Sequence, residues 1–76
     1  MRVISQDGTI NVPYESNMFA IIEEEEKFYV GVRDYNHCIL LTDPYQTRGD
    51  ARAAFNKLIS AGETNIVPNG TFKFSW

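Results

Sequence analysis

The sequence has very little of the chemistry that builds disulfides, metal centres or membrane spans. Cys38 is the only cysteine, so no intrachain disulfide can form and no thiolate metal cage can be built within one chain. No apolar run approaches the roughly 18 residues that a membrane span needs, and a turn at residues 6–8 interrupts the N-terminal segment before a signal-peptide core could form. These absences predict an intracellular protein that makes no contact with a membrane.

A surplus of basic residues is also missing, since 7 Lys and Arg stand against 10 Asp and Glu. Non-specific binding of nucleic acid depends on neutralising phosphates, so a net charge of −3 argues against a general nucleic-acid binder. With 43% apolar and 22% charged residues, the composition is that of an ordinary globular protein. We expect residues 1–76 to form a single domain of modest stability, because so short a chain buries only about 60% of its unfolded surface.

The chain is expected to begin with a β-hairpin. Asp7-Gly8 separates two short apolar runs, and this dipeptide is typical of a tight hairpin turn because glycine tolerates positive φ. Pro13 has no backbone N–H, so the second strand should end there.

Three further strands are expected before the helix. Residues 18–22 are apolar throughout, which favours a strand, and the four glutamates at 23–26 predict an exposed loop that closes a second hairpin. Residues 27–33 alternate with the period of two of a half-buried strand. Residues 37–42 are apolar on both faces, which predicts a central strand with Cys38 as a small core residue.

The segment after residue 43 changes to the helical period of 3.6. Its apolar residues recur at helical spacing over 47–62, which predicts a helix of roughly 12 to 14 residues. Thr47 is expected to cap this helix by accepting a hydrogen bond from the Asp50 amide, although Asp50 itself is a rival cap. Gly62 falls where a left-handed residue often ends a helix.

An aromatic strand is expected at the C-terminal end. Asn-Gly at 69–70 separates residues 65–67 from an alternating run with Phe72, Phe74 and Trp76 on one face, which predicts a strand pair. One helix cannot cover so much apolar surface, so we expect a homo-oligomer. The fold class predicted is α+β, a small antiparallel sheet built from hairpins with one helix packed on a face.

The sequence offers little for catalysis or metal binding. His37 and Cys38 are neighbours on a strand and point to opposite faces, so they cannot form a thiolate-imidazole pair. Four consecutive glutamates lack the spaced oxygens and the glycine of a calcium loop. Neither Gly-containing turn continues into a phosphate-binding fingerprint. We therefore expect no enzyme, no bound metal and no cofactor.

Two arginines at the start of the predicted helix are the strongest candidates for a binding site. Arg48 and Arg52 are four residues apart and share a face, where the positive end of the helix dipole disfavours cations. A salt bridge to Asp43 or Asp50 would offset that cost. Alternatively, both guanidinium groups and the free N–H groups near Gly49 would bind a phosphate or carboxylate.

Tyrosines add aromatic surface that can stack on a ring. Tyr45 precedes the helix, and Tyr14 follows the first hairpin. Strands hold tyrosines routinely for packing, so a structural role is the alternative for each. With the arginines and Gly49, these two tyrosines complete the set of ligand-binding residues predicted from the sequence.

The N-terminal segment "MRVISQDGTINVPYE", residues 1–15, resembles the start of a group of very small proteins encoded by phages, prophages and their bacterial hosts. The resemblance implies that "PYE" is structural: Pro13 stops the strand, Tyr14 packs over the sheet edge and Glu15 faces water. Some small phage proteins of this general kind act as counter-defence sponges that sequester cyclic nucleotide immune signals. The resemblance implies a similar origin and assigns no ligand-contact residue.

The expected function is that of a small phage or prophage accessory protein in the cytoplasm of a bacterial host. It would bind an anionic or nucleotide-like small molecule and sequester a cyclic nucleotide signal. The alternative is a protein–protein interaction module that docks on a host or phage protein through a sheet edge or the aromatic tail.

Overall fold

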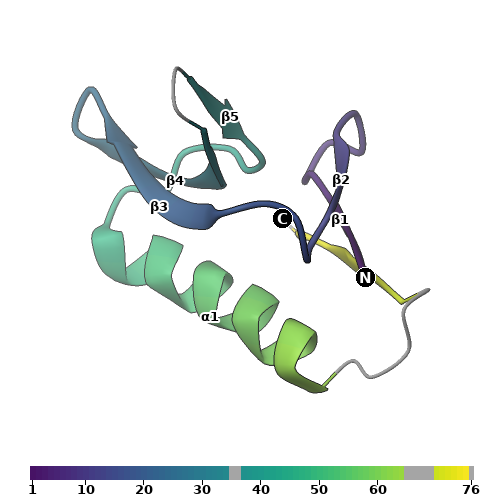
Figure 1. The fold of residues 1–76 in the computed structure, drawn as a ribbon. Coiled ribbons are helices and arrows are strands. Elements are labelled where there is room, and N and C mark those ends of the chain that lie inside the picture. The colour runs from purple at the N-terminus through teal and green to yellow at the C-terminus, as the bar shows by residue number, and fades with distance from the viewer. Residues whose placement is uncertain (35–36, 65–69, 76) are drawn as a thin grey trace.

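The computed structural model describes residues 1–34, 37–64 and 70–75. Within these residues, six strands form two three-stranded sheets and one helix packs beside them (Figure 1). This arrangement confirms the expected α+β class. In chain order the elements are β1 (Arg2–Ile4), β2 (Asn11–Pro13), β3 (Phe19–Glu24), β4 (Lys27–Arg33), β5 (Cys38–Leu40), α1 (Arg48–Thr64) and β6 (Thr71–Lys73).

The first sheet joins the two ends of the chain in the order β2-β1-β6. β1 and β2 form the expected N-terminal hairpin, and β2 ends at Pro13 as predicted. β6 pairs with β1 in parallel, so Val3 has Val12 on one side and Phe72 on the other. The expectation of antiparallel pairing alone was therefore wrong for this strand. Residues 65–67 and the turn at Asn69, expected to pair with the C-terminal strand, lie outside the described residues.

The second sheet has the order β3-β4-β5, with β4 in the centre. Residues 37–42 were expected to supply the central strand, but only Cys38–Leu40 form a strand and it lies at the edge. β4 takes the centre because it pairs antiparallel with β3 along one edge and with β5 along the other. As a result Cys38, at the start of an edge strand, is exposed and not a core residue.

The two hairpin turns are built differently. At the first, Gly8 has φ +82°, and the Asp7 carboxylate accepts hydrogen bonds from the Thr9 amide, the Thr9 hydroxyl and the Ser5 hydroxyl. These hydrogen bonds, the one from the Thr9 backbone foremost, lower the pKa of Asp7 to about 2. The local chemistry that predicted this turn is thus the chemistry that forms it.

The second turn is shorter than predicted. Glu23 and Glu24 belong to β3, where they pair with Phe28 and Lys27. Only Glu25 and Glu26 form the turn, with φ of 51° and 65°. Two successive residues with positive φ match the backbone twist of a hairpin. Because the turn needs only two residues, the other two glutamates of the predicted loop belong to the strand.

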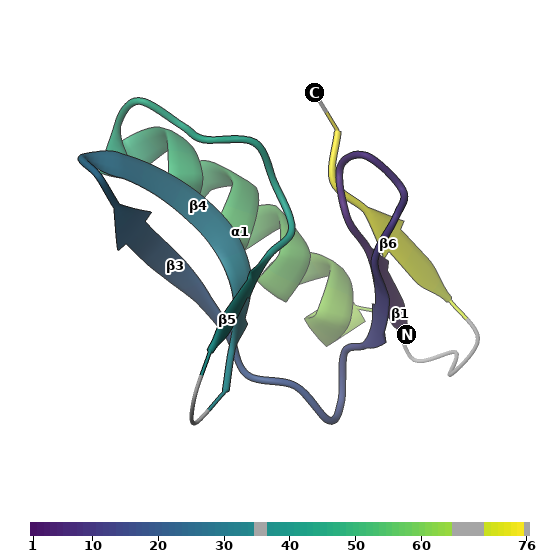
Figure 2. The same cartoon turned by 90° about the horizontal axis from the view of Figure 1, so that it is seen from above.

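The core lies where the two sheets and the helix meet. Seen from above, α1 runs along β3 and β4 while the β2-β1-β6 sheet stands near its C-terminal end (Figure 2). Val3, Val30 and Leu58, one from each of these units, are fully buried. Hydrogen bonds also join segments next to the two sheets: the Gln6 side chain donates to the Ser75 carbonyl at 2.7 Å and accepts from the Asp43 amide at 2.7 Å.

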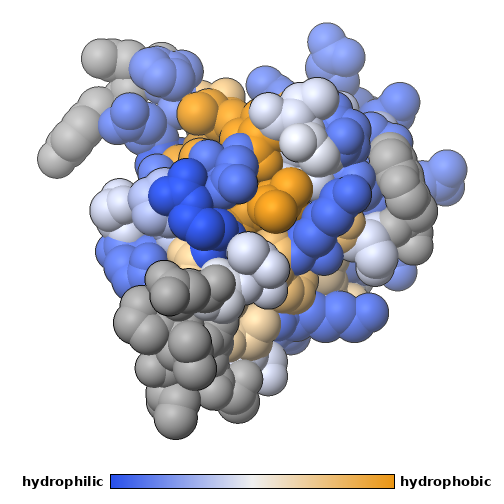
Figure 3. Space-filling model, turned by 90° about the vertical axis from the view of Figure 1, so that its right-hand side faces the viewer, coloured by the Kyte–Doolittle hydropathy of each residue, from blue (hydrophilic) through white to orange (hydrophobic). Residues whose placement is uncertain are grey.

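The aromatic C-terminal strand faces this core. Phe74 is 3% exposed and Phe72 is half-buried, and their rings meet edge to face with centroids 5.1 Å apart. The apolar surface expected to drive self-association is therefore turned inward at these residues, and Trp76 lies outside the described residues. From the side of the β2-β1-β6 sheet, polar side chains surround an apolar area (Figure 3).

Gly62 lies inside α1 and does not end it. Within the described residues, Gly8 is the glycine with positive φ, and the helix continues to Thr64, so the left-handed cap expected at Gly62 was wrong. A Cβ at Gly62 would lie 2.4 Å from Cζ of Tyr14, so the missing side chain makes room for the tyrosine ring. Tyr14 also stacks on Phe19 at 5.6 Å.

Tyr14 thus packs on Phe19 of the edge strand β3, as expected for a ring over a sheet edge, and it also contacts the helix at Gly62. Glu15 is exposed as expected and accepts a hydrogen bond from the Met1 amino group at 2.6 Å. That positive group lowers the pKa of the Glu15 carboxyl.

Candidate functional site

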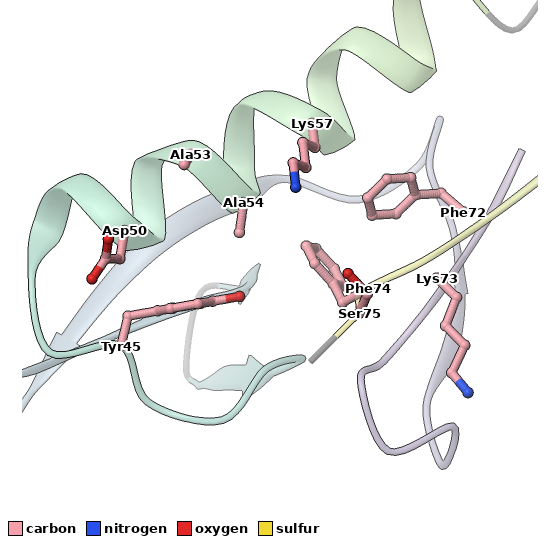
Figure 4. A pocket seen from close by; sticks show the side chains of 9 residues that line it. All are labelled: Tyr45, Asp50, Ala53, Ala54, Lys57, Phe72, Lys73, Phe74 and Ser75. Carbon is pink, nitrogen blue, oxygen red and sulfur yellow. The ribbon is translucent and has the colours of Figure 1, made fainter.

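A groove of about 320 Å³ lies between α1 and β6 (Figure 4). Tyr45, Phe72 and Phe74 line it with aromatic rings. On the helix side, Ala53 and Ala54 lie between Asp50 and Lys57 in the sequence, and their methyl groups are too short to fill the space beneath α1. Small side chains opposite large ones therefore leave a hollow at a place where larger residues would close the packing.

The walls of the groove are fixed by backbone pairing. Tyr45 exchanges two backbone hydrogen bonds with Phe28 of β4, at 3.0 and 2.7 Å, which holds the loop before α1 against the second sheet. On the opposite wall, the Phe74 amide donates to the Ile4 carbonyl at 3.2 Å. Gln6 bonds segments next to both walls, so the two sides are positioned relative to one another.

The groove carries opposite charges at its two ends. Asp50 and Lys57 both line it and are seven residues apart on α1, which is about two turns or 10 Å along the axis. In Figure 4 the Lys57 side chain reaches into the groove, whereas Lys73 points away from it. The Lys73 amino group lies instead beside the turn at Gly8.

Tyr45 lies between these ends and is uncharged at neutral pH. Burial, followed by the negative charges of Asp43 and Asp50, raises the pKa of its phenol above the ordinary value. A protonated phenol can donate or accept a hydrogen bond and offers the face of its ring. The ring extends across the groove toward Phe74 (Figure 4).

Arg48 lies on the other flank of the helix. Its guanidinium lies 3.4 Å from the Glu23 carboxylate, and its Cζ is 5.4 Å from the centroid of the Phe28 ring. The acidic partner is therefore Glu23, because β3 runs beside the helix, and not Asp43 or Asp50 as the sequence suggested. The arginine and the glutamate are both more than half exposed, so the ion pair contributes little to stability.

The structure does not bring the five predicted site residues together. At about 100° per residue, Arg48 and Arg52 lie roughly 140–180° around the helix from Lys57 and the groove. Tyr14 contacts Gly62, about 21 Å along the axis from Arg48. Gly49 lies in the first turn of the helix, beside Arg48.

Of the predicted residues, Tyr45 is the one that lines the groove. Lys57, Phe72 and Phe74 were not among the candidates. The inward alternation of the two phenylalanines was visible in the sequence, but their position opposite Lys57 depends on the parallel pairing of β6 with β1. No local pattern indicates that pairing.

A second groove, of about 520 Å³, lies at the open end of the β3-β4 hairpin. Met18 lines it and is 68% exposed, the most exposed large apolar side chain among the described residues. Val32 and Ile39 contribute apolar surface, while Arg33 and Asp34 add charges of both signs. Unlike the groove between α1 and β6, this second groove has no aromatic residue in its described lining.

Comparisons with protein-family models, with curated proteins and with solved structures found no match. In the described part of the chain, no three His, Cys, Asp or Glu side chains are placed to hold a metal ion. The same residues contain no helix with the length and apolar character needed to cross a membrane.

Proposed function

We propose that this protein is a small-molecule binding domain, without catalytic activity, that takes an anionic ligand with a flat ring in the groove between α1 and β6. One observation carries the proposal: the rings of Tyr45, Phe72 and Phe74 and the amino group of Lys57 line the same hollow. Aromatic faces bind flat rings by stacking, and an ammonium group binds phosphate or carboxylate. Nucleotides combine both features.

The resemblance of residues 1–15 to small phage and prophage proteins supports a biological setting for this binding. In that setting the protein is an accessory protein in the bacterial cytoplasm that sequesters a nucleotide signal. A sponge needs binding and no turnover, and the groove offers charged groups at its ends with aromatic rings between them.

The test compares the single lysine on the groove flank of α1, Lys57, with the two arginines on the opposite flank. Thermal unfolding and calorimetry of the full chain are recorded with adenosine 5′-monophosphate and with a cyclic dinucleotide. We expect a ligand-dependent rise in melting temperature, because a ligand that binds only the folded state stabilises it. Lys57→Gln should remove most of this rise, and the Arg48→Gln, Arg52→Gln double variant should retain it.

The reverse result would assign the anion site to the start of the helix instead of the groove. If the arginine double variant lost the response and Lys57→Gln kept it, the anion would bind at the start of the helix and the groove proposal would fail. If neither nucleotide raised the melting temperature or gave heat of binding, nucleotide binding as such would be rejected.

A second candidate, a protein-binding surface, is favoured by the exposed Met18 beside the second groove. The nearest partner to test is another copy of the chain. Sedimentation of the protein and of Met18→Ser at high micromolar concentration should show an oligomer that the substitution weakens. A monomer in both samples would rule out self-association through this surface.

A further inference from the structure

The groove between α1 and β6 is polarised, and this polarity bears on which ring it accepts. Asp50 lies at one end and Lys57 at the other, both on the flank of α1 that faces β6. Tyr45 and Phe74 lie between them. A ligand whose acid group binds Lys57 therefore has its ring on the aromatic residues and the far edge of that ring toward Asp50.

An ionised aspartate only accepts hydrogen bonds, so it distinguishes between ring edges. An exocyclic amino group donates to the carboxylate, whereas a ring carbonyl oxygen in the same place is repelled by it. The Asp50 backbone amide is already bonded to Thr47 Oγ1 at 3.1 Å as part of the helix cap. Among the described residues, the Asp50 carboxylate takes part in no hydrogen bond or ion pair of its own, so it remains available to a ligand.

We infer that the groove selects ligands that carry an amino group on the ring and an acid group about two helical turns away, such as adenine or cytosine nucleotides. Asp50 accepts a hydrogen bond from the amino group, Lys57 binds the acid group, and the partly exposed ring of Tyr45 packs on the ligand ring above the buried Phe74. This inference rests on the proposed function, because it assigns the orientation of a ligand in that groove.

Adenosine and inosine 5′-monophosphate differ in the group concerned, an amino group against a carbonyl. Calorimetry of the full chain should show tighter binding of the adenosine nucleotide, by about ten-fold, since hydrogen bonds to charged groups are the stronger ones and this site is open to water. Asp50→Asn should bring the two affinities close together, because an amide both donates and accepts. Glu23→Gln, on the other flank, should leave the ratio unchanged.

Lys57 provides the independent readout of orientation. Lys57→Gln should reduce the affinity difference between adenosine and its monophosphate while preserving the preference for adenine over hypoxanthine. Melting temperatures of each variant without ligand establish that the fold is intact, and Asp50→Glu offers a second variant that keeps the charge and should retain the preference.

The outcomes separate the two proposals. Equal binding of the adenosine and inosine nucleotides, or a ratio unaffected by Asp50→Asn, would overturn the inference and leave nucleotide binding in the groove standing. Failure of both mononucleotides to bind would overturn this inference, and failure of the cyclic dinucleotide as well would overturn the proposed function.

Discussion

The two ends of α1 contain the same residue type with opposite roles. Near the N-terminal end, a Cβ at Gly49 would meet only Thr47 Oγ1, at 3.9 Å, an ordinary contact. Near the C-terminal end, a Cβ at Gly62 would overlap the ring of Tyr14. Glycine costs the helix conformational entropy at both places. Only at Gly62 does tertiary packing compensate for that cost.

The difference shows that the beginning of the helix follows local rules and that its end follows packing. At the beginning, the Asp50 amide donates to Thr47 Oγ1, which confirms the cap predicted from the sequence. At the end, the helix continues through Gly62 to Thr64, and the ring of Tyr14 occupies the space that a side chain at Gly62 would fill. Substitutions at the two ends should therefore respond to different surroundings.

The largest effect is expected at Gly62. Gly62→Ala should lower the free energy of unfolding by about 1–3 kcal/mol, because the added methyl group forces the Tyr14 ring out of its place. Urea unfolding followed by circular dichroism measures this change. In a Tyr14→Leu background the same substitution should cost much less. A Gly62→Ala protein as stable as the original would break the comparison.

Loss of the cap is expected to have the next largest effect. Thr47→Ala should cost about 1 kcal/mol in the free energy of unfolding, because the Asp50 amide loses its partner at the exposed helix start. Thr47→Ser retains the hydroxyl and serves as the matched control. No loss at Thr47 together with a clear loss in Asp50→Ala would assign the cap to Asp50 instead.

Gly49→Ala should have the opposite sign to Gly62→Ala. The site is open, so the methyl group meets nothing closer than 3.9 Å, and alanine reduces the entropy of the unfolded chain. We expect a gain of about 0.5–1 kcal/mol, measured in the same urea titrations. A destabilised variant would show that the first turn depends on glycine as the last turns do.

The smallest effect is expected for the arginine beside Gly49. Arg48→Gln removes an exposed ion pair with Glu23 and relieves an unfavourable charge near the positive end of the helix dipole, so the two changes nearly cancel. The free energy of unfolding should change by less than about 0.5 kcal/mol. Arg52→Gln is the control without the ion pair. A loss above 1 kcal/mol specific to Arg48 would mean that its contact with Phe28 contributes substantially.

Sequence reasoning predicted the features that depend on a few neighbouring residues. It identified the turn at Gly8, the end of β2 at Pro13 and the cap at Thr47, and each is present. It was wrong where one residue type is compatible with two structural roles. Gly62 matched the pattern of a helix end, but it lies within the helix, where the absence of a side chain makes room for the Tyr14 ring. Cys38 looked like a core residue on an apolar strand, but that strand lies at an edge.

The candidate site was predicted less well than the fold. Tyr45 was predicted from the sequence as a ligand-binding residue, and it lines the candidate site. Among the other predicted ligand-binding residues, the arginines lie on the opposite flank of the helix and Tyr14 lies near its far end. Helical spacing identifies which residues share a face, and it does not indicate which face packs against which sheet. The order of the strands and the path of the chain decide that question.

By itself the sequence determined the elements of this protein: the hairpins, the helix with its cap and the inward alternation of Phe72 and Phe74. These depend on backbone dihedrals and hydrogen bonds within a few residues. Only the tertiary structure decided what the elements face. The parallel pairing of β6 with β1, the Gln6 bond to Ser75 and the groove beside Lys57 join segments far apart in the chain. Such contacts form because the whole domain buries the most apolar surface in one arrangement. A short stretch of sequence around each residue therefore does not indicate them.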